Sequence, residues 1–417
     1  MAWRRTTGAS GNRADRLPEA LEIAGGKTMY DFETRIERRG TDSVKWDIDN
    51  PKVNGEGMLP MWVADMDFAC PPEVTEAIVQ RAAHPIYGYS LKSAAFFASL
   101  QEWIRKRFGV EVETSWMAGI PGVVPGIHVA IEAYTSPGER VLIQTPVYHP
   151  FFHAVENRGR QVVRSSLREQ DGHYEMDWDD LTKKLSDPAV KLMLLCSPHN
   201  PVGRVWTRQE LERLGALCLE HGVIVVADEI HADLVYEQGS HTPYYSLPPE
   251  LARQSVTFLA ASKTFNLAGL FTSYLLTENR QLLRDFTATA SRMGYENMNL
   301  FGMEATIAAY RHGEPWLNEL LMYLQQNATY IQRYLSEHVP GVCMPVPQAT
   351  YLGWMDFRRL GLKQPELNRL LREKAKLGFQ DGVVFGQEGE GFQRINFACP
   401  RAVVEEAMER LKRAITE

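Results

Sequence analysis

The stretch "VKLMLLCSPHNPVGRVWTRQELERLGALCLEHGVIVVADEIH" (190–231) decides the fold. It contains two short apolar runs, at 190–196 and 222–228, with a helix-like segment at 207–222 between them. In that segment leucines recur at helical spacing and a glycine stands at the end, as at many helix termini. Continuous apolar strands that alternate with helices are typical of a mostly parallel sheet covered on both faces.

The same alternation extends through the middle of the chain, whereas the last third has a different pattern. Further apolar runs lie at 141–144, 255–260 and 273–277. The last third predicts a mixed set of elements, namely a long amphipathic helix at 316–339, a strand at 350–357, a helix near 365–378, a strand at 392–399 and a closing helix at 401–415. We therefore expect an α/β fold with a mostly parallel central sheet in a large domain, and a smaller α+β domain.

The chain length of 417 residues is too great for a single ordinary core. We expect a flexible N-terminal extension at 1–28 and a segment at 29–70 that packs with the small domain. The large, ligand-binding domain is expected at 71–310 and the small C-terminal domain at 311–417.

Composition and charge exclude several function classes. The net charge of −7 carries no basic bias, which argues against nucleic acid as a partner. No apolar run reaches the roughly 18 residues that a membrane-spanning helix needs, and the N-terminus lacks the apolar core of a secretory signal. Five isolated cysteines without a CxxC pair indicate reduced thiols, so we expect a cytoplasmic protein.

Unusual polar residues follow the central strands, at the points where the strands end. The loops concerned are "TPVYHP", "SPHNPVG", "DEIH" and "ASKTFN". In open parallel sheets ligands bind beyond the carboxyl ends of the strands, so these side chains are expected to line one crevice. The candidates are Tyr148, Asn200, Asp228, His231 and Lys263.

A helix start adds a phosphate-binding element to this crevice. Gly122 precedes a helix-like run with Pro125 in its first turn, and helix N-termini bind phosphate through free N–H groups. Such a set suits pyridoxal 5'-phosphate (PLP). The aldehyde of PLP needs a lysine amine, its ring nitrogen needs a carboxylate, and an aromatic ring can stack on its face. No metal site is expected, because Pro150 interrupts the spacing of His149 and His153.

The order of "SPHNPVG", "DEIH" and "SKTFNLAG" resembles that of the fold-type I, aminotransferase-like PLP enzymes. The stretches "MYDFETRIERRGTDSVKWD", "MWVADMDFACP", "IYGYS" and "RINFACPR" are similar to those of the cystathionine β-lyase branch, the MalY/PatB-type C–S lyases. The resemblance runs from Met29 to the C-terminus. It implies a fold-type I PLP-dependent transferase fold within the class I/II aminotransferase family.

The resemblance also implies a role for each residue around the cofactor. Lys263 would form the Schiff base and Asp228 would pair with the pyridine nitrogen. Asn200 would hold the 3-oxygen of the ring, and Tyr148 would stack on the ring and is a second catalytic candidate.

For the cofactor phosphate and the substrate, the resemblance implies a second set of residues. The backbone N–H groups of Val123 and Val124 would meet the phosphate. Arg394 would bind the substrate α-carboxylate, with a backbone contact from Ala64. Tyr89 would reach into the active site of a partner subunit, which implies a homodimer with shared active sites.

Two departures from the aminotransferase pattern stand out. His231 occupies the position where aminotransferases usually have a tyrosine, and a histidine there is usual in the lyase branch. Ala260 and Phe271 replace the serine and arginine that commonly bind the phosphate. Ser262 is therefore a candidate phosphate donor, together with the helix start.

The resemblance implies α,β-elimination of L-cystathionine and related cysteine S-conjugates. Lys263 would take the Cα proton, and either Lys263 or Tyr148 would protonate the leaving thiolate. The products would be a thiol such as homocysteine, pyruvate and ammonia. An aminotransferase shares the steps up to the carbanion and is the main alternative. A non-catalytic role in binding a transcription regulator, which is found in some proteins of this branch, is a further alternative.

Overall fold

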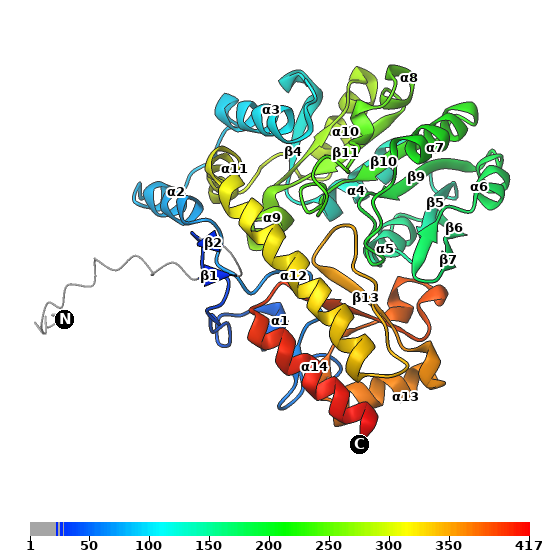
Figure 1. The fold of residues 1–417 in the computed structure, drawn as a ribbon. Helices are drawn as coiled ribbons and strands as arrows, with labels where there is room; N and C mark the ends of the chain where they lie inside the picture. The colour runs from blue at the N-terminus through cyan, green and yellow to red at the C-terminus, as the bar shows by residue number, and fades with distance from the viewer. Residues whose placement is uncertain (1–21, 24–25, 28) are drawn as a thin grey trace, which may run out of the picture.

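The computed structural model describes residues 22–23, 26–27 and 29–417. The flexible extension predicted at 1–28 therefore lies outside the described residues, except for four positions that form the paired strands β1 (Glu22–Ile23) and β2 (Gly26–Lys27). The larger part of the molecule surrounds a seven-stranded sheet, and a smaller part at one side carries the C-terminus (Figure 1).

The seven-stranded sheet is parallel except for one strand. Its order is β4 (Met117–Ile120), β12 (Ser273–Leu276), β11 (Ser255–Leu259), β10 (Ile224–Asp228), β9 (Val190–Cys196), β5 (Arg140–Thr145) and β6 (Gln161–Ser166). β12 runs antiparallel to both of its neighbours, and the other neighbouring pairs are parallel. The carboxyl ends of β5, β9, β10 and β11 therefore meet at one edge. The predicted α/β fold class is confirmed.

Helices cover both faces of this sheet because successive strand residues point to opposite sides. In β9, Leu192 and Leu194 pack into a core with α4 (Val123–Tyr134) and α10 (Arg280–Arg292). Met193 and Leu195 pack on the other face, against α6 (Trp178–Leu185) and α7 (Arg208–Glu220). The continuous apolar pattern of the strands follows from burial on both faces.

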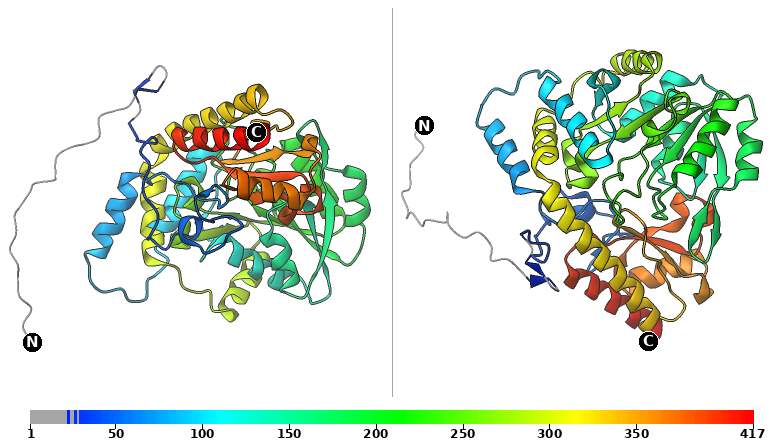
Figure 2. Two further views of the ribbon diagram at one scale, coloured as in Figure 1. Left: turned by 90° about the horizontal axis from the view of Figure 1, so that it is seen from below. Right: turned by 45° about the horizontal axis from the view of Figure 1, so that its top comes forward.

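A three-stranded sheet organises the smaller part of the molecule. It consists of β13 (Leu352–Asp356), β16 (Phe392–Asn396) and β15 (Gln380–Asp381). The helices α12 (Glu314–His338) and α14 (Arg401–Thr416) lie side by side against it (Figure 2). α12 also reaches the larger part, where it begins beside α11 (Leu300–His312) (Figure 1).

The helix predicted near 365–378 is wrong at its C-terminal end. α13 spans Gln364–Arg369, and a short π-helix continues it over Leu370–Lys374. Leu377–Gly378 then form β14, which pairs in parallel with β3 (Leu59–Pro60). A Cβ at Gly378 would lie 1.9 Å from the carbonyl oxygen of Val53, so this close approach requires glycine. The pairing joins the N-terminal segment to the C-terminal part, a contact that local periodicity does not reveal.

The remaining elements complete the architecture. They are α1 (Val44–Asp47), α2 (Pro72–Ala82), α3 (Ala94–Phe108), α5 (Pro150–Glu156), β7 (Arg168–Gln170), β8 (His173–Glu175), α8 (Pro249–Ala252) and α9 (Ala261–Thr264). Among the described residues, no helix is both long enough and apolar enough to cross a membrane.

Candidate active site

A cavity of about 230 Å³ lies at the carboxyl ends of β9, β10 and β11. Nine of the residues predicted from the sequence line it, namely Ala64, Val123, Val124, Tyr148, Asn200, Asp228, His231, Ser262 and Lys263. A larger cavity of about 720 Å³ lies elsewhere, around Tyr174 and Trp354, and none of the predicted residues lines it. The smaller cavity therefore holds the candidate chemistry.

Lys263 stands in α9, the short helix that follows β11. Its Nζ donates a hydrogen bond to the carbonyl oxygen of Ala64 at 2.6 Å. The side chain is half-buried because it faces the cavity, but the surrounding protein withdraws its amine from bulk water. This burial lowers the pKa of Lys263 to about 8, although the charge of Asp65 acts in the opposite direction. An amine with this pKa is available as a nucleophile and as a base near neutral pH.

Asp228 is the last residue of β10 and is only 4% exposed. Burial raises the pKa of its carboxyl group to about 7, although Lys263 and a hydrogen bond of 3.2 Å from the backbone N–H of Ile230 favour the charged form. The carboxyl group is thus sensitive to any cation placed in the cavity. A protonated ring nitrogen is one such cation.

His231 and Tyr148 are neutral polar groups in the same cavity. Burial lowers the pKa of His231 to about 3, and its Nδ1 has no hydrogen-bond partner among the described residues. Burial also raises the pKa of Tyr148 to about 12, with a further contribution from Asp228. Both side chains can therefore donate or accept a hydrogen bond without carrying charge at neutral pH.

Arg394 comes from β16 in the smaller part of the molecule and is 3% exposed. Its guanidinium donates to Oδ1 of Asn200 at 3.1 Å and to the carbonyl oxygen of Trp62 at 2.7 Å. Within the described residues Nε has no partner and no carboxylate forms an ion pair with this arginine. Burial lowers the pKa of Arg394 to about 10. A buried guanidinium without a carboxylate is suited to the carboxylate of a ligand.

The start of α4 forms the wall beside Lys263. Gly122 precedes the helix with φ of 108°, a backbone conformation that favours glycine. The free N–H groups of the first helical turn, at Val123 and Val124, are available for an anion. Ser262 adds a hydroxyl group to the same cavity.

The donor set fits PLP. An amine without a carboxylate partner, a buried carboxyl group, an unpartnered imidazole nitrogen and a helix N-terminus match the aldehyde, ring nitrogen, ring oxygen and phosphate of that cofactor. This fit depends on residues that come from separate segments of the chain.

Some lining residues were missed by the sequence analysis. They are Cys196, Ile230, Ala268 and Thr272, and Phe271 also lines the cavity. Cys196 ends β9 directly before "SPHNPVG", so its place at a strand end was a usable signal. No pattern in the sequence pointed to Thr272. Tyr89 does not line the cavity of its own chain and is 99% exposed.

Comparison with known proteins identifies the family. The profile of the family described as aminotransferase class I and II matches residues 57–411. The cystathionine beta-lyase PatB of Bacillus subtilis is 43% identical over 385 residues, which cover 92% of this chain and 100% of PatB. Protein MalY of Escherichia coli is 36% identical, with 93% of this chain and 99% of MalY covered.

A solved structure gives the same result. Cystalysin from Treponema denticola, whose crystal structure contains a pyridoxal 5'-phosphate cofactor, is similar with a TM-score of 0.90 and 35% identity. The similarity covers 93% of this chain and 99% of cystalysin. These findings confirm the resemblance seen in the sequence motifs. The chain belongs to the class I and II aminotransferase family, in the branch that includes PatB and MalY.

Proposed function

We propose that the protein cleaves the Cβ–S bond of L-cystathionine and related cysteine S-conjugates with release of a thiol, and that water hydrolyses the remaining aminoacrylate to pyruvate and ammonia. Its class is that of a PLP-dependent carbon–sulfur lyase, as the similarity to PatB and cystalysin supports. The observation that carries the proposal is that Lys263, an amine with a pKa near 8, lines the cavity. The buried guanidinium of Arg394 contacts Asn200, another lining residue, and has no carboxylate partner among the described residues.

Arg394 binds the α-carboxylate of the amino acid in this proposal. The carboxylate would meet a guanidinium that has no competing anion, and the resulting charge-assisted hydrogen bonds are among the strongest in proteins. Asn200 keeps one amino group of the guanidinium in place through its Oδ1. The backbone of Ala64 lies at the same cavity and completes the contacts to the carboxylate.

Lys263 takes the proton from Cα. Its amine is deprotonated in a useful fraction near pH 8, and a base with a pKa close to the working pH transfers protons efficiently. PLP, when bound, supplies an electron sink for the charge that develops at Cα. Asp228 would hold the positive charge of the ring nitrogen, and Tyr148 would stack on the ring.

Loss of the Cβ–S bond leaves a thiolate that must be protonated. Lys263 carries the proton that it took from Cα, and the hydroxyl group of Tyr148 stays protonated because burial raises its pKa to about 12. Either group donates a proton at the sulfur atom. The N–H groups of Val123 and Val124, with Ser262, would hold the phosphate, while His231 and Asn200 would donate hydrogen bonds to the ring oxygen.

We also propose a homodimer with shared active sites in the cytoplasm. Support for the dimer comes from exposed apolar side chains near Tyr89, namely Ile86 (67%), Tyr87 (59%) and Leu91 (88%). Tyr89 itself would enter the partner's cavity. The free cysteines among the described residues suit a reducing compartment. The domain boundaries after residues 70 and 310 remain predictions, and the β3–β14 pairing supports the placement of 29–70 with the C-terminal part.

Pyruvate release from L-cystathionine without an added keto acid tests the proposed reaction. We expect stoichiometric pyruvate and homocysteine. Transfer of the amino group to a keto acid without pyruvate would overturn the lyase proposal in favour of an aminotransferase. A cellular phenotype that persists in Lys263→Ala after the loss of the bound cofactor's absorbance would instead favour the regulator-binding role.

A further inference from the structure

The segment Trp62–Phe68 lies between the two most important cations of the site. The carbonyl oxygen of Ala64 accepts hydrogen bonds from Nζ of Lys263 at 2.6 Å and from the hydroxyl group of Tyr351 at 2.9 Å. Two residues earlier, the carbonyl oxygen of Trp62 accepts a hydrogen bond of 2.7 Å from Arg394. One piece of backbone therefore holds both the amine of Lys263 and the guanidinium of Arg394.

This segment forms no helix or strand, so contacts with other parts of the chain set its position. The backbone N–H of Asp67 donates to the carbonyl oxygen of Ala398 at 2.9 Å. Nδ2 of Asn396 donates to the carbonyl oxygens of Val63 (2.6 Å) and Asp65 (2.5 Å).

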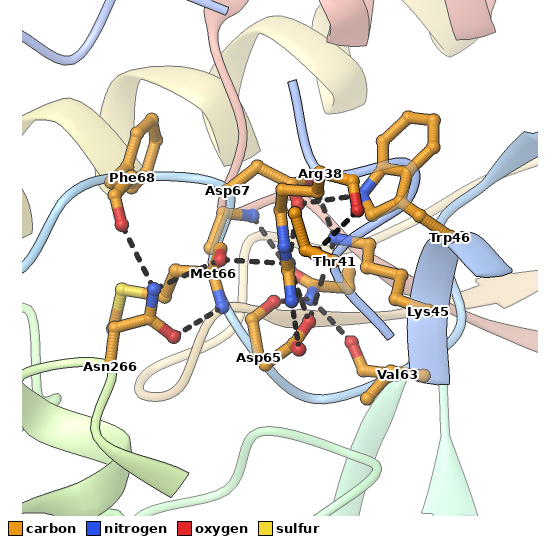
Figure 3. Close-up of polar contacts among 12 residues, drawn as sticks. Arg38, Thr41, Lys45, Trp46, Val63, Asp65, Met66, Asp67, Phe68 and Asn266 are labelled. Atoms are coloured by element: carbon orange, nitrogen blue, oxygen red, sulfur yellow. Dashed lines mark hydrogen bonds and ion pairs between the residues drawn. The ribbon is translucent and has the colours of Figure 1, made fainter. Parts of the chain in front are cut away.

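Asn266 provides the attachment on the side of Lys263. Its Nδ2 donates to the carbonyl oxygens of Met66 at 3.0 Å and Phe68 at 2.9 Å, and its Oδ1 accepts from the N–H of Met66 at 3.0 Å (Figure 3). A single side chain thus satisfies three backbone groups of the segment.

Asn266 is also rigidly connected to Lys263. It stands three residues later in the same turn, which is closed by a hydrogen bond of 2.8 Å from the N–H of Leu267 to the carbonyl oxygen of Ser262. Its φ of 60° lies in the left-handed region, where asparagine is tolerated better than most residues. The turn that carries Lys263 therefore also binds Trp62–Phe68, the segment that accepts the hydrogen bond from the Lys263 amine.

The opposite side of the segment is fixed by an ionic cluster. Arg38 pairs with Asp65 and Asp67, each at 2.7 Å, and Lys45 pairs with Asp67 at 2.6 Å. The indole N–H of Trp46 also donates to Asp67 at 3.0 Å (Figure 3). The segment is held from both sides, and Asn266 is the attachment that belongs to the catalytic turn.

We propose that Asn266 is a positioning residue for the reaction: it fixes Trp62–Phe68 so that the Ala64 carbonyl receives the Lys263 amine while the Trp62 carbonyl receives Arg394. This inference deepens the proposed function and rests on it for the roles of the two cations. A displacement of about 1 Å at groups that orient a substrate can cost about 100-fold in rate. Loss of Asn266 displaces the base and the carboxylate anchor together.

Two variants separate the side chain from the backbone conformation. Asn266→Gly retains access to positive φ and removes all three hydrogen bonds. Asn266→Asp tolerates the same conformation and keeps an acceptor for Met66, but it loses both donors and sets a carboxylate against two carbonyl oxygens. We expect kcat/KM for L-cystathionine to fall about 10- to 100-fold in both variants, with lower kcat and higher KM.

A second measurement needs no sulfur substrate. The rate at which PLP adds to Lys263 in the apoenzyme depends on the deprotonated amine and should be half-maximal near pH 8 in the unaltered protein. Without a fixed Ala64 carbonyl, the ammonium form loses an acceptor, so the midpoint should move to lower pH by about half a unit or more. Because this readout is independent of elimination, it stays informative if L-cystathionine proves not to be the substrate.

Asn279 supplies the matched control. Its side chain, also half-buried, makes three hydrogen bonds to backbone groups, as acceptor from Gln281 (2.9 Å) and Leu282 (3.2 Å) and as donor to Arg253 (2.8 Å). It caps α10, and it does not line the cavity. Asn279→Gly should lower Tm without changing kcat/KM or the midpoint of PLP addition.

Comparison of the Asn266 and Asn279 variants decides whether Asn266 has a positioning role. A wild-type kcat/KM and midpoint in Asn266→Gly, or changes no larger than those of Asn279→Gly at equal loss of Tm, would overturn the positioning role. If Asn266→Gly does not fold, Asn266→Ser replaces it, since a serine hydroxyl is too short to span both carbonyl groups. An unshifted midpoint in that variant would overturn the proposal equally.

Discussion

Lys45 and Lys263 are both withdrawn from water, but they have different partners. Lys45 is 1% exposed and its Nζ lies 2.6 Å from a carboxylate oxygen of Asp67. Burial alone would raise the pKa of Asp67, but Lys45 and Arg38 outweigh that effect and hold this pKa below its ordinary value. Among residues 22–23, 26–27 and 29–417, the only hydrogen-bond acceptor of Lys263 is the carbonyl oxygen of Ala64, at 2.6 Å.

This difference in partners shows how lysine can have a structural role in one region and a proposed chemical role in another. The ion pair between Lys45 and Asp67 holds the N-terminal segment in place. A neutral carbonyl group stabilises the ammonium form of Lys263 much less than a carboxylate would, so burial lowers its pKa to about 8. The lysine that we propose as the reactive one is therefore the one without a carboxylate in direct contact among the described residues.

The largest expected effect comes from removal of the reactive lysine. Lys263→Ala should lower pyruvate release from L-cystathionine by about 1,000-fold or more, because both the nucleophile and the base are lost. The absorbance of the bound cofactor should change as well. Activity within about 10-fold of the unaltered enzyme would show that another group takes the Cα proton.

Removal of the carboxylate anchor should have the next largest effect. Arg394→Ala should lower kcat/KM by about 100-fold or more, since loss of a buried charge-assisted contact costs about 2–5 kcal/mol. Most of this fall in kcat/KM should come from a higher KM, measured across a series of L-cystathionine concentrations. Arg394→Lys should recover only a part, because an ammonium group cannot bind a carboxylate and Asn200 in the same planar geometry. An unchanged KM would contradict the assigned role.

The structural lysine should show the reverse pattern. Lys45→Met breaks a buried ion pair, which costs about 3–5 kcal/mol of unfolding free energy. Denaturant unfolding should record this loss. Because Arg38 still pairs with Asp65 and Asp67 and keeps Trp62–Phe68 in place, kcat/KM of the folded enzyme should stay within about 3-fold. A large loss of kcat/KM at full folding would erase the distinction between the two lysines.

The smallest effect concerns the pH dependence of stability in the apoenzyme. The folded-state pKa of Lys263 is about 8 and its ordinary value is 10.5, so between these pH values the unfolded chain binds a proton that the folded chain does not. The free energy of unfolding should therefore gain a rising contribution across this window, of at most about 1.4 kcal/mol per pH unit. Lys263→Met should lack this contribution, and Lys45→Met should keep it. Equal slopes in all three proteins would contradict the lowered pKa.

The sequence allowed the sheet and much of the site to be predicted because both depend on local patterns. Each apolar run became a strand, and the polar residues at the strand ends, such as Asp228 and Lys263, reached one cavity. The reversed direction of β12 was not predictable from its composition. Parallel and antiparallel strands buried on both faces have the same apolar pattern.

Long-range contacts account for what the sequence could not supply. Arg394 and Trp62 are 332 residues apart, and their hydrogen bond leaves no periodic signal. Asn266 lies within the motif "SKTFNLAG", but its partners Met66 and Phe68 lie about 200 positions away along the chain. The helix predicted to continue to 378 ended early because Leu377 pairs with Leu59, a partner that only the folded chain provides.

The pairing of β3 with β14 has a consequence for the order of assembly during synthesis. Leu59 leaves the ribosome long before Leu377, so the segment that will touch Lys263 waits while about 300 further residues are made. The large sheet can form in that interval, but the Trp62 carbonyl meets Arg394 only after the last strand has emerged. A nascent chain thus contains the proposed catalytic lysine before the proposed carboxylate-binding Arg394 is in place, so the site is complete only after the C-terminal part has been synthesised.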